Sequence, residues 1–170
     1  MTTTFAFHGE SNGEITAGAE ALFAYLDDPR NLAEHMERSS ATTMAGSAMH
    51  IEVDAQGGRD VGSQIRMSGR MLGLPLSLEE AITERTPPLH KAWQTFGTPR
   101  LIVIGHYRMG FDLQPADART RLRVWIDYEL PSSGLPHWLA KPLARAYAHW
   151  CTEQMVHTAR SHFDTVAHPA

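Results

Sequence analysis

Cysteine is nearly absent from this chain of 170 residues, which contains only Cys151. A single thiol cannot form an intrachain disulfide, and no CxxC pair or paired Cys/His spacing is present to bind structural zinc. A reducing, cytoplasmic setting fits this composition. The chain is long enough to bury a real hydrophobic core, and we expect one domain spanning residues 1–170.

Clusters of basic residues and long apolar segments are also missing. The net charge is −4 and no Lys/Arg cluster occurs, so we expect no nucleic-acid partner. The longest wholly aliphatic run, residues 101–104 (LIVI), is far shorter than the roughly 20 residues of a membrane-spanning helix. The N-terminus lacks the basic region and apolar run of a secretory signal. We therefore predict a cytoplasmic protein without a transmembrane segment.

Motifs for cofactors and nucleophilic catalysis are missing as well. No glycine-rich phosphate loop, dinucleotide fingerprint or Ser-His-Asp spacing occurs. His149, Glu153 and His157 follow one another at i, i+4 steps, a spacing that can hold a metal on a helix face. These three drift across the helix from its polar stripe, so a solvated face is the ordinary interpretation. We predict no cofactor and no metal.

The N-terminal part contains signals for one strand and two short helices. Residues 3–16 predict a strand, and residues 20–26 predict a helix whose apolar face is Leu22, Phe23 and Leu26. A proline follows at position 29, and the residue before a proline disfavours the helical conformation. The first helix should therefore end there, and a second short helix should follow over residues 30–36.

From about residue 42 to residue 130 the pattern changes to an alternation of apolar and polar residues. Gly, Pro and Asp clusters interrupt it at intervals of roughly 10–20 residues, as turns between antiparallel strands do. We predict six strands in this region, each with one buried face. The buried face of the last strand is predicted to be Leu122, Val124, Ile126, Tyr128 and Leu130.

A long amphipathic helix is predicted near the end, over about residues 139–166. Its opposite, polar stripe contains Arg145, His149, Glu153 and Arg160. Pro142 suits only a first turn, so residues 135–140 are compatible with a separate helical turn. The inward face is predicted to be Leu143, Tyr147, Trp150, Gln154, Thr158 and Ser161. Its polar part fits either a polar or solvent-filled cavity or an overhang that is wet on all sides.

This order of elements predicts an α+β fold. We expect a helix-grip arrangement, in which a curved antiparallel sheet of about seven strands wraps around the long C-terminal helix and two short helices follow the first strand. A curved sheet leaves a gap around a helix unless bulky side chains fill it. A cavity between the sheet and the helix is the expected consequence.

Several segments resemble the START-like, helix-grip superfamily, often labelled SRPBCC, which includes polyketide cyclases and lipid-transfer proteins. The resemblance covers nearly the whole chain, and its motifs are structural. The matching segments are residues 21–32 (ALFAYLDDPRNL), 61–63 (VGS), 84–88 (ERTPP), 105–111 (GHYRMGF), 126–131 (IDYELP) and 147–151 (YAHWC). The last three look like a bacterial subgroup of unassigned role. The resemblance implies binding of hydrophobic or aromatic small molecules, and in a minority of members catalysis, but no universal catalytic motif.

Glu80 is the candidate catalytic residue. Every second residue of a strand faces the same side, which places Glu80 among apolar neighbours, with Leu76, Leu78 and Ile82. A carboxyl group that lines a cavity has a raised pKa and can serve as general acid or base. The alternative is a β-bulge, which would turn Glu80 toward water because a one-residue slip reverses every side chain.

Two tyrosines, two tryptophans and one turn offer further candidate contacts. Tyr107 and Tyr128 share the inward parity, where a phenol can donate a hydrogen bond to a ligand from an apolar wall. Trp93 and Trp125 have the parity of the outer sheet face, which suggests a protein contact. The apolar turn at residues 71–76 (MLGLPL) could be a lid, a dimer contact, a membrane-touching tip or a segment packed on the first helices.

The leading hypothesis is a binding or carrier protein for a small hydrophobic or aromatic ligand. A cyclase- or dehydratase-like enzyme using Glu80 is the alternative, and an interaction module is a third class that leaves a homodimer open. The predicted ligand-binding residues are Ile65, Met67, Leu78, Tyr107, Met109, Phe111, Val124, Ile126, Tyr128, Trp150, Gln154 and Thr158.

Overall fold

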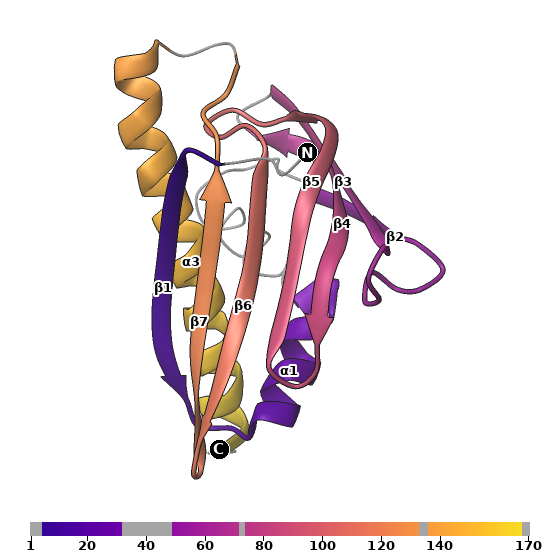
Figure 1. Cartoon of the computed structure of the whole chain (residues 1–170), viewed down its shortest axis with the longest axis vertical. Coiled ribbons are helices and arrows are strands. Elements are labelled where there is room, and N and C mark those ends of the chain that lie inside the picture. Colours follow the sequence, from indigo (N-terminus) through magenta and orange to yellow (C-terminus); the bar gives the residue numbers. More distant parts are fainter. Residues whose placement is uncertain (1–4, 32–48, 72–73, 133–135, 168–170) are drawn as a thin grey trace.

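A computed structural model describes residues 5–31, 49–71, 74–132 and 136–167. Figure 1 shows one antiparallel sheet with a long helix running along one of its faces. The elements are β1 (Phe7–Ile15), α1 (Ala19–Asp27), β2 (Met49–Val53), β3 (Gln64–Met71), β4 (Leu74–Thr86), β5 (His90–Arg100), β6 (Tyr107–Ala116), β7 (Arg119–Tyr128) and α3 (His137–Ala167). The predicted α+β helix-grip fold is confirmed.

The sheet has seven strands in the order β1-β7-β6-β5-β4-β3-β2. Strands β2 to β7 follow one another through hairpin-type connections, and every pair is antiparallel. The N-terminal strand closes the other edge by pairing with β7, for example Ser11 opposite Val124. The chain therefore brings its first strand and its last strand together, and α3 packs mainly on these two strands.

The buried face follows the predicted alternation in β6 and β7. Phe111, Leu122 and Val124 have no measurable exposure, and α1 covers this part of the core because Phe23 packs edge-on against Phe111 at 5.6 Å. The predicted second short helix begins at residues 29–31. Its remaining residues lie outside the described part of the chain, as does the tip of the predicted apolar turn at residues 72–73.

The prediction for the face of α3 that packs on the sheet was wrong. The buried face is rotated about the helix axis by about one residue from the predicted one. Leu143 is 40% exposed, Ser161 is exposed, and Trp150, Gln154 and Thr158 are only half-buried. Small residues face the sheet instead, and they let the helix approach β1 closely. The buried residues of α3 are Ala140, Ala144, Ala148, Cys151, Thr152, Met155, Val156 and Ala159.

Two further predictions for single residues need correction. Pro142 lies inside one continuous helix that begins at His137, so residues 137–140 belong to that helix and not to a separate turn, whereas residue 135 lies outside the described residues. Pro142 is the sixth helical residue, where its missing N–H costs one hydrogen bond near the start of the helix. Trp93 points inward into the core, and Trp125 on the outer face is only 7% exposed.

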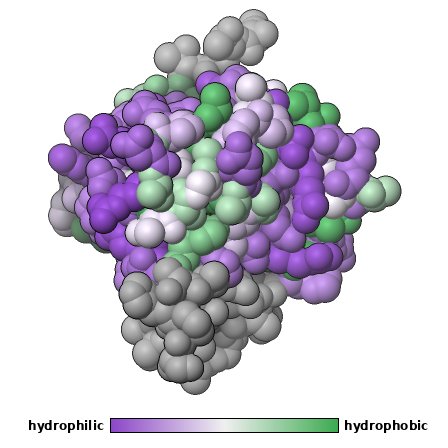
Figure 2. All heavy atoms as spheres, turned by 90° about the horizontal axis from the view of Figure 1, so that it is seen from below, coloured by the Kyte–Doolittle hydropathy of each residue, from purple (hydrophilic) through white to green (hydrophobic). Residues whose placement is uncertain are grey.

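Trp125 is covered by polar neighbours rather than open to a partner. Its indole N–H donates to Asp112 Oδ2 at 3.1 Å, and the Arg108 guanidinium lies over its ring at 5.2 Å. Of the large apolar side chains that remain exposed in the described residues, Val61 and Leu89 lie in two separate connections and Trp138 and Leu143 lie near the start of α3. Figure 2 shows, on the face seen from below, weakly apolar atoms in the middle and further apolar atoms near the rim, among hydrophilic ones.

Among the residues that the structure describes, no helix is long and apolar enough to cross a membrane.

Candidate functional site

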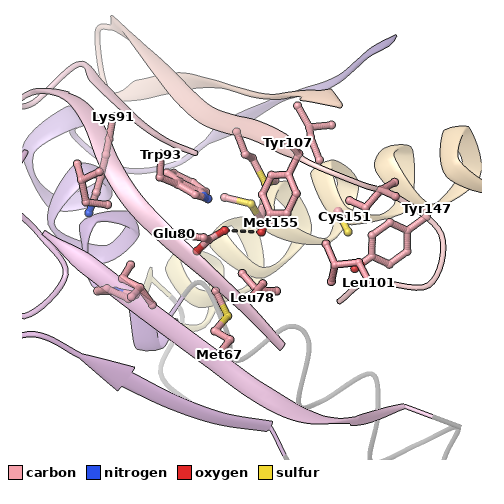
Figure 3. Close-up of a pocket in the computed structure, with 16 residues that line it drawn as sticks. Met67, Leu78, Glu80, Lys91, Trp93, Leu101, Tyr107, Tyr147, Cys151 and Met155 are labelled. Atoms are coloured by element: carbon pink, nitrogen blue, oxygen red, sulfur yellow. Dashed lines mark hydrogen bonds between the residues drawn. The ribbon is translucent and has the colours of Figure 1, made fainter. Parts of the chain in front are cut away.

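A cavity of about 80 Å³ lies between the inner face of strands β3 to β7 and the helix α3. A cavity of this size has room for a compact organic group. Its walls are mostly apolar. Figure 3 shows the lining side chains converging on it from the sheet and from α3. They are Pro29, Ile65, Met67, Leu78, Glu80, Ile82, Lys91, Trp93, Leu101, Ile104, Tyr107, Met109, Ile126, Tyr147, Cys151 and Met155.

Seven of the residues predicted to be catalytic or ligand-binding line this cavity. They are the candidate acid Glu80 and the predicted ligand-binding residues Ile65, Met67, Leu78, Tyr107, Met109 and Ile126. All of them lie on strands, where strict alternation makes the inward face readable from the sequence.

The other six predicted ligand-binding residues do not line it. Phe111 and Val124 are buried in the core toward α1 and β1, and Tyr128 is buried and stacks on Phe7 at a centroid distance of 5.6 Å. Because the helix face differs from the predicted one, the three positions on α3 also point elsewhere: Trp150, Gln154 and Thr158. Gln154 faces a polar surface groove between α3 and β1.

Glu80 is the only carboxyl group on the cavity wall among the described residues. The ladder between β4 and β5 shifts register on both sides of it, between Ser77 and Glu79 and between Ile82 and Glu84. Despite these irregularities, Glu80 points inward and is only 3% exposed. The prediction that Glu80 faces the apolar side of the strand is therefore correct, and the alternative in which it faces water is wrong.

The environment of Glu80 favours its protonated form up to near neutral pH. Burial raises the pKa of Glu80 to about 7, and hydrogen bonding by Tyr107 and Trp93 partly opposes this rise. The Tyr107 hydroxyl donates a short hydrogen bond to Oε1, drawn as a dashed line in Figure 3. A buried carboxyl with a pKa near neutrality can both give and take a proton in this range.

Two titratable groups of α3 face the same space. Tyr147 and Cys151 are one helical turn apart, and burial raises the pKa of the Cys151 thiol to about 12. The pKa of Tyr147 is raised well above its usual value by Cys151 and by burial. Both groups therefore stay neutral near pH 7, so the thiol is not a ready nucleophile.

Lys91 is a lining residue that the sequence analysis missed. It is 1% exposed, and its ammonium donates to Asp27 Oδ1 at 2.7 Å, to the Asp27 carbonyl at 2.9 Å and to the Gly58 carbonyl at 3.3 Å. Burial lowers the pKa of Lys91, and the bond to Asp27 partly opposes this. These contacts hold its charge at one end of the cavity.

Asp27 is shared between Lys91 and a second cation. Arg85 donates from Nη2 to Oδ2 at 2.8 Å and from Nε to Oδ1 at 3.2 Å. Burial alone would raise the pKa of Asp27, but the hydrogen bonds from Arg85 and Lys91 outweigh it and hold that pKa below its usual value. The last residue of α1 is thereby tied to strands β4 and β5.

The histidines and the acid at i, i+4 spacing on α3 lie on its solvated face. His149 Nε2 is 3.3 Å from Glu153 Oε1, and both side chains are exposed. In the described part of the chain, no group of three or more His, Cys, Asp or Glu residues is arranged to hold a metal ion.

The sheet, the helix that it grips and the enclosed cavity define a helix-grip protein of the START-like class. The chain belongs to the polyketide cyclase/dehydrase and lipid transport family, whose model matches residues 7–161. No curated protein matches the chain.

Solved structures share this fold over nearly the whole chain. The Zhui aromatase/cyclase from a Streptomyces species is 16% identical, with a TM-score of 0.70 and 96% of each chain covered. A norcoclaurine synthase point mutant from Thalictrum, solved with a transition-state analogue, is 14% identical, with a TM-score of 0.67 and coverage of 99% and 100%. A START superfamily protein from Mycobacterium smegmatis is 14% identical, with a TM-score of 0.60 and coverage of 94% and 98%. At these identities the likeness establishes the fold alone.

Proposed function

We propose that this chain is a binding protein that holds a compact apolar or aromatic molecule in the cavity between the sheet and α3. The observation that carries the proposal is an apolar cavity whose wall contains one buried carboxyl, Glu80. Removing apolar ligand surface from water contributes about 25 cal/mol per Å². A single hydrogen-bonding point then orients the ligand, as in most small-molecule sites.

Backbone amide chemical shifts of the full chain, measured by NMR during titration with the neutral probe benzyl alcohol, test this proposal. We expect saturable shifts that concentrate on cavity residues such as Met109 and Ile126. Met67→Trp should abolish them, because Met67 is a half-buried lining residue whose replacement by an indole fills the cavity. Trp150→Ala is the matched control, because Trp150 does not line the cavity and its loss should leave the shifts unchanged. Shifts that are absent, or equally strong in Met67→Trp, would contradict the proposal.

An acid/base enzyme of the cyclase or dehydratase kind is the second candidate function. It is favoured by one specific observation, the pKa of about 7 for Glu80 beside the Tyr107 hydroxyl. In this role Glu80, in its ionised form, removes a proton from the carbon next to a ligand carbonyl. Tyr107 has one O–H to donate, so on ligand binding it must turn from Glu80 Oε1 to the carbonyl oxygen. Positioned proton transfer of this kind contributes about 10²–10⁴-fold to a rate.

Deuterium uptake by 1-indanone in heavy water, followed by NMR, tests the catalytic role. The wild-type chain should accelerate exchange at the carbon next to the carbonyl. Glu80→Gln should abolish the acceleration while binding survives, and Tyr107→Phe should reduce it. If the wild-type protein binds the ketone but exchange stays at the buffer rate, the acid/base function fails and the binding function stands.

A further inference from the structure

The charged side chains around the cavity are equal in number but are not all paired directly. Glu80 and Lys91 are the only lining residues of opposite charge among those described, but they are not paired with each other. An ammonium group has three protons to donate. Lys91 directs its hydrogen bonds to Asp27, twice, and to the Gly58 carbonyl, so none is left for Glu80.

The second nearby cation is committed as well. Arg85 makes its two side-chain hydrogen bonds to Asp27 and also lies 4.0 Å from Asp60. Glu80 therefore receives hydrogen bonds from a phenol and an indole, and the charge of Lys91 lowers its pKa only through space. In the described part of the chain no cationic side chain forms a direct ion pair with it. A carboxylate has about four acceptor positions, so it can accept further donors from a ligand.

The remaining walls suit a positive charge in an apolar setting. Three aromatic side chains line the cavity, and Figure 3 shows Trp93 and Tyr107 on either side of the Glu80 carboxyl. Aromatic faces attract cations through the ring quadrupole, most strongly where water is excluded. The thioethers of Met67, Met109 and Met155 add polarisable surface of adaptable shape.

We propose that the cavity selects compact apolar molecules that carry a protonated amine, with the ammonium group paired to Glu80 and the apolar part held by the aromatic and methionine side chains. This inference rests on the proposed binding function and specifies its ligand class. An ammonium ligand supplies the directly hydrogen-bonded counter-charge that Lys91 does not provide, in a site where ion pairing is stronger than in water. A ligand carboxylate would instead meet Glu80 as a like charge, and Lys91 is not free to compensate.

The affinity for an amine should depend on pH in a defined direction. The titratable groups that face Glu80 are Tyr107 on β6, Lys91 on β5, and Tyr147 and Cys151 on α3. The tyrosines and the thiol stay neutral, because their pKa values lie well above neutrality. Deprotonation of Glu80 is therefore the step that creates the anion, and amine affinity should rise as pH increases from about 6 to about 8.

Isothermal titration calorimetry with three probes of matched shape tests the inference: benzylamine, benzyl alcohol and benzoate. At about pH 8 we expect the wild-type chain to bind benzylamine at least about tenfold more tightly than benzyl alcohol, which corresponds to about 1.4 kcal/mol. Benzoate should not bind measurably. Glu80→Gln should remove the advantage of the amine and leave the alcohol unaffected. Glu79→Gln is the matched control, because Glu79 is the next residue but pairs with Arg66 at 2.8 Å on the outer face.

The possible outcomes separate the ligand class from the binding function. Equal affinity for the amine and the alcohol, or an amine advantage that survives in Glu80→Gln, overturns the ligand class but leaves cavity binding intact. Failure of all three probes to bind the wild-type chain overturns both. If Glu80→Gln does not fold, as judged by circular dichroism, the pH dependence of the benzylamine affinity of the wild-type chain tests the ligand class instead. An amine affinity that is flat between about pH 6 and about pH 8 contradicts the inference.

Discussion

Glu80 combines two properties that usually oppose each other in a folded chain, namely nearly complete burial and a titratable side chain. Leu78 and Ile82, two residues before and after Glu80, are buried in the same wall, so the neighbouring side chains of the strand remain packed. The penalty for burying a carboxyl there is electrostatic, because the charged form is desolvated and only Tyr107 and Trp93 offer it hydrogen bonds. This makes the protonation of Glu80 a measurable contribution to stability.

We predict that the wild-type chain loses stability between about pH 5 and about pH 8 relative to Glu80→Gln. Burial raises the pKa of Glu80 from 4.5 to about 7, so in this interval the folded chain holds a proton that the unfolded chain releases. The contribution of Glu80 is therefore fully present below pH 4.5 and is lost as pH rises through 7. A shift of this size corresponds to about 3 kcal/mol, as an order of magnitude. Urea unfolding of both proteins at the two pH values measures the difference, and parallel pH profiles would contradict it.

Alternation along the strands predicted Glu80 and Tyr107 because each has apolar neighbours two residues away on a strand with one wet face. The same reasoning failed on β5. There Lys91, Ala92 and Trp93 are buried in succession, so both faces are covered and no alternation is left to read. Lysine is also the residue type least expected inside, and nothing in the sequence connects it to Asp27, which is 64 residues away.

At the scale of elements, α3 shows why the predicted helix face was wrong. The prediction gave weight to large apolar residues, and Leu143 and Trp150 turned out to be exposed or half-exposed. The face that packs on β1 consists of Ala148, Thr152 and Val156, small residues that carry little hydrophobic signal but permit close approach. Gly9 and Gly13 on β1 complete this contact from the other side. Spacing could reveal that the helix is amphipathic, whereas the choice of face required knowledge of the glycines opposite.

This close approach predicts different costs for two similar substitutions on β1. In Gly13→Ala the new Cβ would lie 2.4 Å from Val156 Cγ1, so either the strand or the helix must move. We expect a loss of about 1–3 kcal/mol, as for other overpacked cores. In Gly9→Ala, the matched control, the nearest atoms are 3.6 Å away, and the change should be neutral or slightly stabilising.

Chemical denaturation measures both free energies of unfolding. Val156→Ala should offset part of the cost of Gly13→Ala in the double variant, because it removes the methyl group that the new Cβ would meet. Additive losses in that double-mutant cycle would show that the two positions are not in conflict.

The junction between α1 and the sheet depends on the buried charges of Asp27, Lys91 and Arg85. We predict that Asp27→Asn destabilises the chain by about 3–5 kcal/mol, because it leaves the Lys91 ammonium buried without its counter-charge. Asp28→Asn is the matched control. Asp28 pairs with Arg59 near the surface at 3.1 Å, and its loss should cost no more than about 1 kcal/mol. Thermal unfolding of the two variants measures both losses of stability. Equal losses in Asp27→Asn and Asp28→Asn would contradict the prediction.

At the scale of the whole molecule, the cavity follows from the position of α3, which packs on one edge of the sheet and not on the other. The helix α3 packs mainly on β1 and β7, at one edge of a seven-stranded sheet. The inner faces of β3, β4 and β5 extend beyond that contact, and the cavity lies between them and Tyr147, Cys151 and Met155 of α3. The sequence predicted a cavity from the curvature of the sheet, but its location required the helix face that sequence could not resolve.

A ligand that fills this space should therefore stabilise the whole fold by bridging the sheet and the helix. At a benzylamine concentration of about 100 times its dissociation constant, the expected gain is about 2.7 kcal/mol. For a chain of this size, that corresponds to a rise in Tm of roughly 5–10 °C. Differential scanning calorimetry should show this rise at about pH 8 and a smaller one at about pH 5, where Glu80 is protonated. Met67→Trp should show no rise at either pH, whereas Trp150→Ala should respond as the wild-type chain does. A rise that is equal in all three proteins would place the amine outside the cavity.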